Sequence, residues 1–177
     1  IAREKGNWLT GSLSYTLMQA EGLSQDARQG LIYYEWGIPT PARLFPLSWD
    51  QRHSIKLIAN TSLPWDVNVN VNWSFHTGRP FTYYPTIDGF TSLDSTLKFE
   101  PNNRSIADYS QVDVKASKTF TWPGDFLSVT LFVDVRNLFN KENVLWVDSG
   151  GKIGGELGDI SAYGQPRRTS VGVRVEL

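Results

Sequence analysis

The stretch that decides the fold of this chain is Val67-Asn68-Val69-Asn70-Val71-Asn72-Trp73-Ser74-Phe75-His76. Apolar and polar residues alternate across all ten positions. Successive side chains of a β-strand point to opposite faces of the sheet, so this strand has one apolar and one polar face. The apolar face must contact either the core of a soluble protein or the acyl chains of a membrane, and that choice decides the class of protein.

Five further segments show the same alternation, near residues 8–19, 52–63, 111–121, 126–138 and 168–177. Ile58 and Phe132 interrupt the polar faces, and Lys118 falls on an apolar face close to the end of its segment. No segment repeats apolar residues at helical spacing, so we expect essentially no helix. Around residues 137–140 the alternation changes phase, which is compatible with a β-bulge.

The connections between the predicted strands alternate between short and long. Residues 64–66 and 122–125 are short and rich in turn-forming residues. The other three, at residues 20–51, 77–110 and 148–167, far exceed the usual hairpin loop of about two to five residues. Short turns at one rim and long loops at the other are typical of outer-membrane barrels.

The chain has seven tryptophans, and six of them fall near predicted strand ends. Three belong to the rim with the short turns and three to the rim with the long loops: Trp8, Trp65 and Trp122, and Trp49, Trp73 and Trp146. Indole rings prefer membrane interfaces, because they combine an apolar body with a polar N–H. The pattern indicates two aromatic girdles, separated by strands of about ten residues whose tilted length matches an apolar band of about 25 Å.

The composition excludes several classes of function. The net charge is −1, with 17 basic and 18 acidic residues, so no nucleic-acid partner is expected. Cysteine is absent, which excludes disulfides, Cys-based zinc sites and cysteine nucleophiles. No apolar run is long enough for a transmembrane helix. The chain has no initiator Met and no signal peptide and opens almost directly into a strand, so we expect a fragment or a processed piece of a longer protein.

No catalytic constellation is visible, so we expect a protein that is not an enzyme and has no cofactor. The two histidines, His53 and His76, lie at predicted strand ends without the close partners that a metal site needs, and we expect no metal. No serine sits in a Gly-x-Ser-x-Gly elbow. The glycine-rich residues 149–155 lack the Gly-Lys-Ser/Thr ending of a phosphate loop.

Charged residues of opposite sign share the polar faces. Asp113 and Lys115 lie on one face, as do Asp134 and Arg136. If the turn at residues 122–125 pairs their two strands, we expect Lys115 to lie diagonally from Asp134, within reach of a long side chain. These residues could line an aqueous lumen, and an ordinary solvated sheet face is the alternative.

Alternation alone does not separate a membrane barrel from a soluble sandwich, whose strands alternate in the same way. The alternating loop lengths, the aromatic residues at strand ends and the near absence of charge from the apolar faces favour the barrel. Six strands are too few to close a membrane barrel, for which about eight is the common minimum, and an open edge cannot stay unpaired in lipid. A soluble β-sandwich binding module and a barrel enzyme or passive porin remain alternatives.

Several motifs resemble, in this order, the C-terminal part of TonB-dependent outer-membrane receptors. They are Trp49-Asp50-Gln51-Arg52-His53, Thr77-Gly78-Arg79-Pro80-Phe81-Thr82, Lys118-Thr119-Phe120, Asp134-Val135-Arg136-Asn137-Leu138-Phe139-Asn140 followed by Asn143-Val144, and Tyr163-Gly164-Gln165-Pro166-Arg167-Arg168. The resemblance implies that residues 1–177 supply the last six strands of an all-β, antiparallel transmembrane barrel of about 22 strands, without its plug domain. Leu177 departs from the family, whose last strand usually ends in an aromatic residue.

The resemblance also implies a location and partners. Such a receptor lies in a Gram-negative outer membrane, binds a scarce ligand such as a siderophore or a sugar, and imports it. The implied partners are outer-membrane lipid, TonB acting through the missing plug region, the barrel-assembly machinery and the imported small molecule. The signal for the assembly machinery would lie in the last strand, at Val171, Val173, Val175 and Leu177.

Ligand contacts are expected on the long loops, where binding residues usually concentrate. The first candidates are Arg79, Phe81, Tyr83 and Tyr84, which combine aromatic residues with a cation, and the second are Tyr33, Tyr34 and Trp36. Stacking of aromatic rings beside a cation suits a siderophore or a sugar. The alternative is that these aromatic residues pack the loops against one another.

Overall fold

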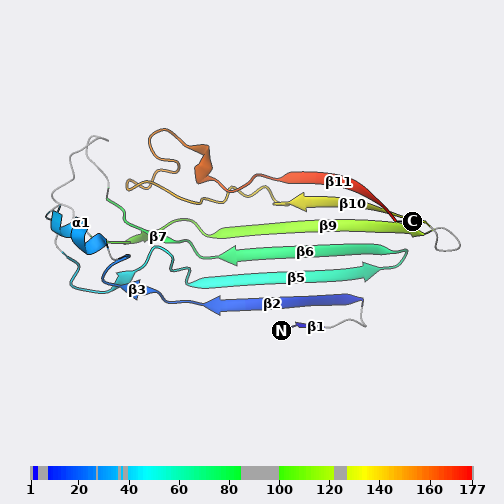
Figure 1. Ribbon diagram of the computed structural model, residues 1–177, viewed down its shortest axis with the longest axis horizontal. Coiled ribbons are helices and arrows are strands. Elements are labelled where there is room, and N and C mark those ends of the chain that lie inside the picture. Colours follow the sequence, from blue (N-terminus) through cyan, green and yellow to red (C-terminus); the bar gives the residue numbers. More distant parts are fainter. Residues whose placement is uncertain are drawn as a thin grey trace.

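The structure is a computed structural model that describes residues 2–3, 8–26, 28–35, 37, 40–84, 100–121 and 127–176. Over these residues the chain forms one long antiparallel sheet with its loops gathered at one end (Figure 1). The order of strands in the sheet is β1-β2-β5-β6-β9-β10-β11. Their bounds are β1 Ala2–Arg3, β2 Leu9–Leu17, β5 His53–Leu63, β6 Val67–His76, β9 Tyr109–Thr121, β10 Ser128–Arg136 and β11 Arg168–Glu176.

The six long strands confirm the six predicted from alternation, with bounds that differ by a few residues. The prediction of an all-β, antiparallel fold is therefore correct. Short elements occupy the long connections: β3 (Glu21–Gly22) pairs with β4 (Phe45–Pro46), and β7 (Pro80–Phe81) pairs with β8 (Arg104–Ser105).

The register brings the apolar residues of all six long strands onto one face of the sheet. Val71 lies between Ala59 of β5 and Val114 of β9. Farther along the sheet, Val133 of β10 lies between Ala116 of β9 and Val171 of β11. Because directly opposite residues project from the same face, the alternation in each strand adds up to one continuous apolar surface.

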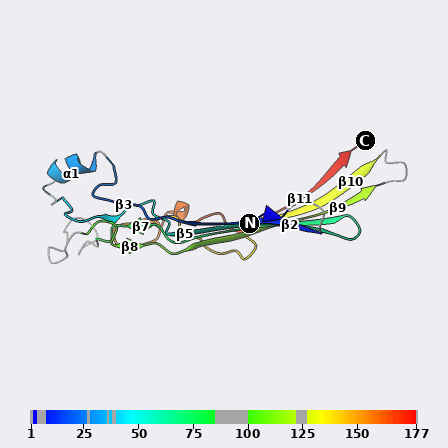
Figure 2. The same ribbon diagram turned by 90° about the horizontal axis from the view of Figure 1, so that it is seen from below.

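This apolar surface is not covered by a second layer within the described residues. The sheet is one layer thick when it is turned on its side (Figure 2). Leu17 is 63% exposed and Val171 is 76% exposed. The buried hydrophobic residues of the described part are Tyr33, Phe45 and Ala162, and all three belong to the loop end rather than to the long strands.

The opposite face of the sheet is polar and carries a row of side-chain hydrogen bonds. The Asn70 amide donates to the Asn60 side chain at 2.6 Å, and the Asn72 amide donates to the Asn70 side chain at 2.9 Å. The Ser62 hydroxyl donates to Asn68 Oδ1 at 2.8 Å. These contacts give the asparagine side chains hydrogen-bond partners within the sheet, as expected for a solvated face with ordered polar side chains.

The turn at residues 64–66 is tight, as predicted, and connects β5 to β6. Trp65 and Asp66 both have positive φ angles, of 65° and 57°. Two consecutive left-handed residues give a backbone twist that matches the twist of the strands that the turn joins. The Trp65 ring is 82% exposed at the end of the sheet. The other predicted short turn, at residues 122–125, lies outside the described residues, as does Trp122.

The expectation of essentially no helix is wrong at two places. Residues Gln29–Glu35 form helix α1, and a single turn of 3-10 helix covers Ile160–Ala162. The Asp26 carboxylate caps α1, because its Oδ1 accepts hydrogen bonds from the backbone N–H groups of Arg28 and Gln29. A helix of seven residues is too short to show a repeating apolar stripe, which is why periodicity missed it.

Near residues 137–140, where a β-bulge was predicted, one backbone contact to β9 continues beyond the assigned strand: the Leu138 N–H donates to the Val112 carbonyl at 2.7 Å. Strand β10 ends at Arg136, and Asn137 and Asn140 both have φ angles of 50°. The change in alternation therefore marks the end of the strand and the start of a turn. Asparagine tolerates the left-handed region better than other non-glycine residues, which explains its use at both positions.

The predicted diagonal contact between Lys115 and Asp134 is also wrong in register. The two residues lie directly opposite each other on β9 and β10. The hairpin closes at the pair Thr121 and Ser128. A four-residue turn at 122–125 would have shifted the pairing by two residues, so the error comes from the assumed turn length.

Candidate ligand-binding loops

The described parts of the three long connections lie at the same end of the sheet, as the alternation of short and long connections predicted. Figure 1 shows α1, β3 and β7 together at the end opposite the β5–β6 turn, with the loop between β10 and β11 beside them. The candidate ligand residues therefore share one rim, which is where a scaffold of strands presents its functional loops.

The Thr77-Gly78-Arg79 segment needs glycine because two loops approach very closely there. A Cβ on Gly78 would lie 1.7 Å from the Ile106 carbonyl oxygen. The Gly78 N–H donates to Asp108 Oδ1 at 2.9 Å, and the Ile106 N–H donates to the Arg79 carbonyl at 3.0 Å. These contacts start the small β7–β8 sheet and set the direction in which the next residues leave β6.

Tyr83 is held firmly by residues of the returning loop. Its N–H donates to Asn103 Oδ1 at 2.8 Å, and the Asn103 amide donates back to the Tyr83 carbonyl at 3.2 Å. The Arg104 guanidinium lies 3.6 Å from the centre of the Tyr83 ring, a close cation–π contact. At least part of the Tyr83 surface is thus used to pack the loops.

The loop between β10 and β11 joins this cluster. The Tyr84 N–H donates to the Ser149 carbonyl at 2.7 Å. Gly151, with a φ angle of 80°, faces the side chains of Tyr83 and Phe81: a Cβ there would lie 3.5 Å from Tyr83 Cε2 and 3.9 Å from Phe81 Cζ. The structure brings Phe81, Tyr83 and Tyr84 together, and the Arg79 side chain beside them is exposed.

The second group of candidates lies on α1 and divides between interior and surface. Tyr33 is 4% exposed, whereas Tyr34 is 85% exposed. Burial raises the pKa of the Tyr33 phenol, and a hydrogen bond with Gln29 partly offsets this. Tyr34 alone of the two offers its ring to an approaching ligand. Trp36 lies outside the described residues.

Asn102 ties the connection at residues 77–110 to the connection at residues 20–51, and sequence reasoning missed it. Its side chain is buried and its φ angle is 51°. Asn102 Nδ2 donates to the Pro46 carbonyl at 2.6 Å, and its backbone N–H donates to Thr82 Oγ1 at 3.0 Å. The Gln25 amide donates to Asn102 Oδ1 at 3.3 Å. In the sequence this residue looks like any polar loop asparagine, because its partners are far away along the chain.

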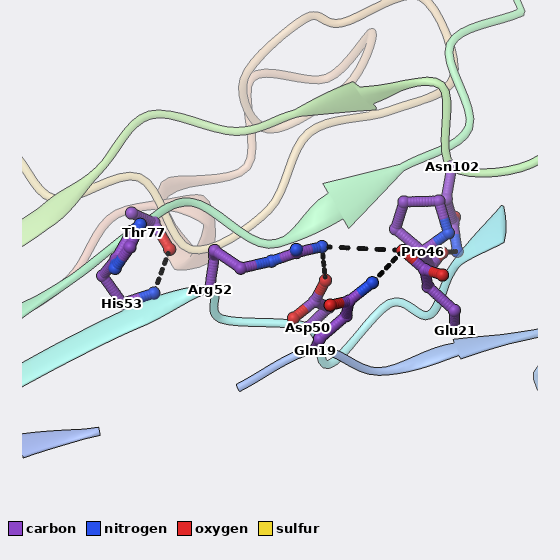
Figure 3. Close-up of polar contacts among 8 residues, drawn as sticks. All are labelled: Gln19, Glu21, Pro46, Asp50, Arg52, His53, Thr77 and Asn102. Carbon is purple, nitrogen blue, oxygen red and sulfur yellow. Dashed lines mark hydrogen bonds and ion pairs between the residues drawn. The ribbon is translucent and has the colours of Figure 1, made fainter. Parts of the chain in front are cut away.

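A second fastening point lies where the first long loop enters β5 (Figure 3). Arg52 Nη2 lies 2.9 Å from Asp50 Oδ2 and 3.8 Å from Glu21 Oε1. The Gln19 amide donates to Glu21 Oε1 at 2.9 Å. The Asp50 carboxylate is nearly buried, so its pairing with Arg52 avoids an isolated buried charge. This network gives the Trp49-Asp50-Gln51-Arg52-His53 motif a structural role.

Next to Asn102 lies a cavity of about 720 Å³ between residues 40–46 and 100–103. Its walls include Arg43, Phe45 and Asn102. The volume is within the range of about 300–1,000 Å³ that small-molecule sites occupy. No sequence motif pointed to this cavity, because its two walls come from different loops.

Three asparagines organise the last long loop and the start of β11. The Asn137 amide donates to the carbonyls of Lys141 and Gln165, and its Oδ1 accepts from the Lys141 N–H. Asn140 Oδ1 accepts from the Arg167 N–H at 2.8 Å. The Asn143 side chain pairs with the backbone of Ser110 as a neighbouring strand would: it accepts from the Ser110 N–H at 2.9 Å and donates to the Ser110 carbonyl at 3.0 Å.

The edge strand β11 presents the residues predicted to form the assembly signal. Val171, Val173 and Val175 are 76%, 63% and 58% exposed and project from the apolar face. Leu177 lies outside the described residues.

The histidines have ordinary partners at the rim of the sheet. His53 Nδ1 lies 2.9 Å from the Tyr15 hydroxyl, and the His76 ring stacks on Tyr109 with centroids 4.6 Å apart. Among the described residues, no three His, Asp or Glu side chains gather as metal ligands would. Nor does any helix in the described part have the length and apolarity needed to cross a membrane.

Comparison with known proteins gives one match of fold and none of family. No family model matches the chain, and a search of curated proteins finds no match. Among solved structures, the chain is similar to the ferric-catecholate import receptor Fiu from K12 E. coli in its closed form, with a TM-score of 0.54 and 15% sequence identity. The match covers 98% of this chain and 19% of the receptor chain. At this identity the likeness shows the fold alone.

Proposed function

We propose that residues 1–177 form the C-terminal part of the barrel of a TonB-dependent outer-membrane receptor that binds a small molecule outside the cell and imports it. The observation that carries the proposal is the continuous, uncovered apolar face of a single-layered sheet whose long loops all lie at one rim. The fold likeness to an import receptor supports the same class.

An apolar face of this extent is not expected on a protein that is surrounded by water. Soluble monomers rarely expose contiguous apolar patches larger than a few hundred Å². Here large apolar side chains are exposed on β2, β10 and β11, among them Leu13, Leu17, Leu131 and Val173. Acyl chains can solvate such a surface at no cost, and the polar face then borders an aqueous interior. A soluble sandwich would need a second sheet against these residues.

The proposed barrel is completed by strands outside this chain. Among the described residues, neither edge of the sheet is fully paired, since β11 has only β10 as a neighbour and β1 covers only part of β2. Backbone groups cannot stay unpaired in lipid, so further strands must pair with both edges in the membrane. We further propose a plug and TonB as partners in transport, and recognition of Val171, Val173, Val175 and Leu177 by the barrel-assembly machinery.

The ligand site is proposed for the loop end and has no enzymatic role. The exposed Arg79 side chain and Tyr34 ring, together with the cavity beside Asn102, are the surfaces available to a ligand. Aromatic rings and a cation at a solvent-exposed rim are suited to binding a siderophore or a sugar.

The test is the behaviour of the isolated chain of 177 residues in water. The proposal predicts that it aggregates without detergent, because nothing covers its apolar face, and that the full-length gene product is found in the outer membrane. A monodisperse, detergent-free monomer would contradict the proposal and support the soluble sandwich.

A further inference from the structure

A charged side chain stands out on the apolar face. Lys118 lies between Val67 of β6 and Leu131 of β10, and it is exposed. Among the described residues of the six long strands, it is the one formally charged residue on this face. A cation in a lipid-facing wall is unfavourable at depth and tolerated near the interface, so its position calls for a partner.

Lys118 is close to the rim with the short turns. It is three residues from the end of β9 at Thr121, about 10 Å along the strand. A lysine stem can lie along apolar surface while its ammonium reaches the polar boundary. Its ammonium also lies 4.9 Å from the centre of the Phe120 ring, on the side of the rim, which holds it away from the middle of the band.

A depression of about 540 Å³ begins at Lys118 and continues over the apolar face. Apart from the lysine, its walls are mostly aliphatic: Val67, Ala116, Leu131, Val133, Val171 and Val173. Ala116 is small, which leaves space between the larger neighbours. Figure 2 shows that the ends of β9, β10 and β11 rise out of the plane of the sheet in this region.

We propose that this depression, the Lys118 groove, binds one acidic phospholipid of the membrane leaflet nearest the short turns. The phosphate group accepts hydrogen bonds from the Lys118 ammonium, and an acyl chain lies along the aliphatic walls. The charge decides between lipids: no carboxylate shares this face among the described residues of the six long strands, and a single cation attracts a net negative headgroup more than a neutral one. The inference rests on the proposed placement of this face in lipid.

The experiment uses the full-length receptor in bilayer discs that contain equal amounts of phosphatidylglycerol and phosphatidylcholine. After mild detergent extraction, native mass spectrometry counts the lipids that stay bound. The wild-type protein should retain phosphatidylglycerol in preference to phosphatidylcholine. Lys118→Gln should lower that preference at least about threefold, Lys118→Arg should keep it, and high salt should weaken it.

The matched control is Lys115→Gln, which removes a lysine three positions away on the polar face of the same strand. It should leave the lipid preference unchanged. An equal loss in both glutamine variants, or an unchanged preference in Lys118→Gln, would overturn the groove. If Lys118→Gln does not fold, Ala116→Leu tests the groove instead: it fills the apolar space without changing charge, and retained phosphatidylglycerol would again overturn the inference.

The two proposals fail in different ways. A wild-type receptor that does not insert into bilayers at all contradicts the membrane placement. A receptor that inserts normally but shows no preference for acidic lipid contradicts the groove only.

Discussion

At the scale of single residues, glycine and asparagine decide where the backbone can go. Gly172 on β11 lies directly opposite Phe132 on β10, and a Cβ at that position would meet the ring at 2.3 Å. The Phe132 ring therefore covers the glycine, with the Lys115 ammonium 4.9 Å from its centre. The phenylalanine that interrupts the polar alternation is thus accounted for by its neighbour on the next strand.

We predict that Gly172→Val destabilises the folded barrel by about 1–3 kcal/mol, because the ring must leave its position. Removing the ring with Phe132→Ala should make the same glycine substitution much less costly, a coupling that a double-mutant cycle measures by urea unfolding in bilayers. Gly30→Ala is the control, since no atom lies within 4 Å of the added carbon. Additive effects of the two β-strand substitutions would show that the ring and the glycine are independent.

Asn137 is the residue on which the last loop depends. Its buried side chain makes three hydrogen bonds to backbone groups of Lys141 and Gln165. Asn137→Ala leaves those groups without partners, and we predict a loss of about 2–4 kcal/mol. Asn68→Ala, with one side-chain partner on the exposed polar face, should cost far less. Similar losses in the two variants, measured by the same unfolding titration, would argue against this role.

At the scale of elements, the short β7–β8 sheet sets how the candidate ligand-binding residues leave the long strands. Gly78 stands where two loops come within contact of each other. We predict that Gly78→Ala pushes residues 104–108 away and exposes the segment to limited proteolysis, while the long strands stay intact. Gly150→Ala, where the added carbon meets only the Asp148 side chain at 3.3 Å, serves as the control. Cleavage that is no faster in Gly78→Ala than in wild type would contradict the contact.

The strands were predictable from the sequence because alternation is a local pattern that each strand repeats several times. The elements between the strands were not predictable in this way. Helix α1 is shorter than the window in which helical periodicity shows, and its cap at Asp26 is one polar residue among many. The register of β9 and β10 required the turn length, which no local pattern gave. The hydrogen bonds of the Asn102 side chain join residues up to 77 positions apart, so only the folded chain reveals them.

The candidate site was predictable only in its location. Loop length placed Arg79, Phe81 and Tyr83 at one rim, and the structure brings the two aromatic rings together there. What the sequence did not provide is which surfaces remain open. Tyr33 is buried and Tyr34 is exposed, and the Arg104 guanidinium stacks on the ring of Tyr83.

At the scale of the whole molecule, the long strands bury none of their hydrophobic side chains within the part of the chain that the structure describes. The strands of the sheet are held by backbone hydrogen bonds and by cross-strand pairs, and its apolar face is exposed. We predict that Val71→Arg, near the middle of β6, lowers the stability of the inserted barrel by about 2–4 kcal/mol, against little for Asn70→Arg on the other face. Unfolding in bilayers measures both, and membrane insertion is checked alongside, because a soluble core would also reject the arginine.

The most direct measurement of the central claim uses the absence of cysteine from residues 1–177, with any cysteine elsewhere in the full-length protein replaced. Spin labels are attached to Val71→Cys and, separately, to Asn70→Cys in the full-length protein in bilayers. The account predicts that the label at 71 is relaxed mainly by oxygen, which concentrates in acyl chains, and the label at 70 mainly by a water-soluble nickel complex. Equal water accessibility at both positions, or a label at 71 shielded from both reagents inside protein, would contradict it.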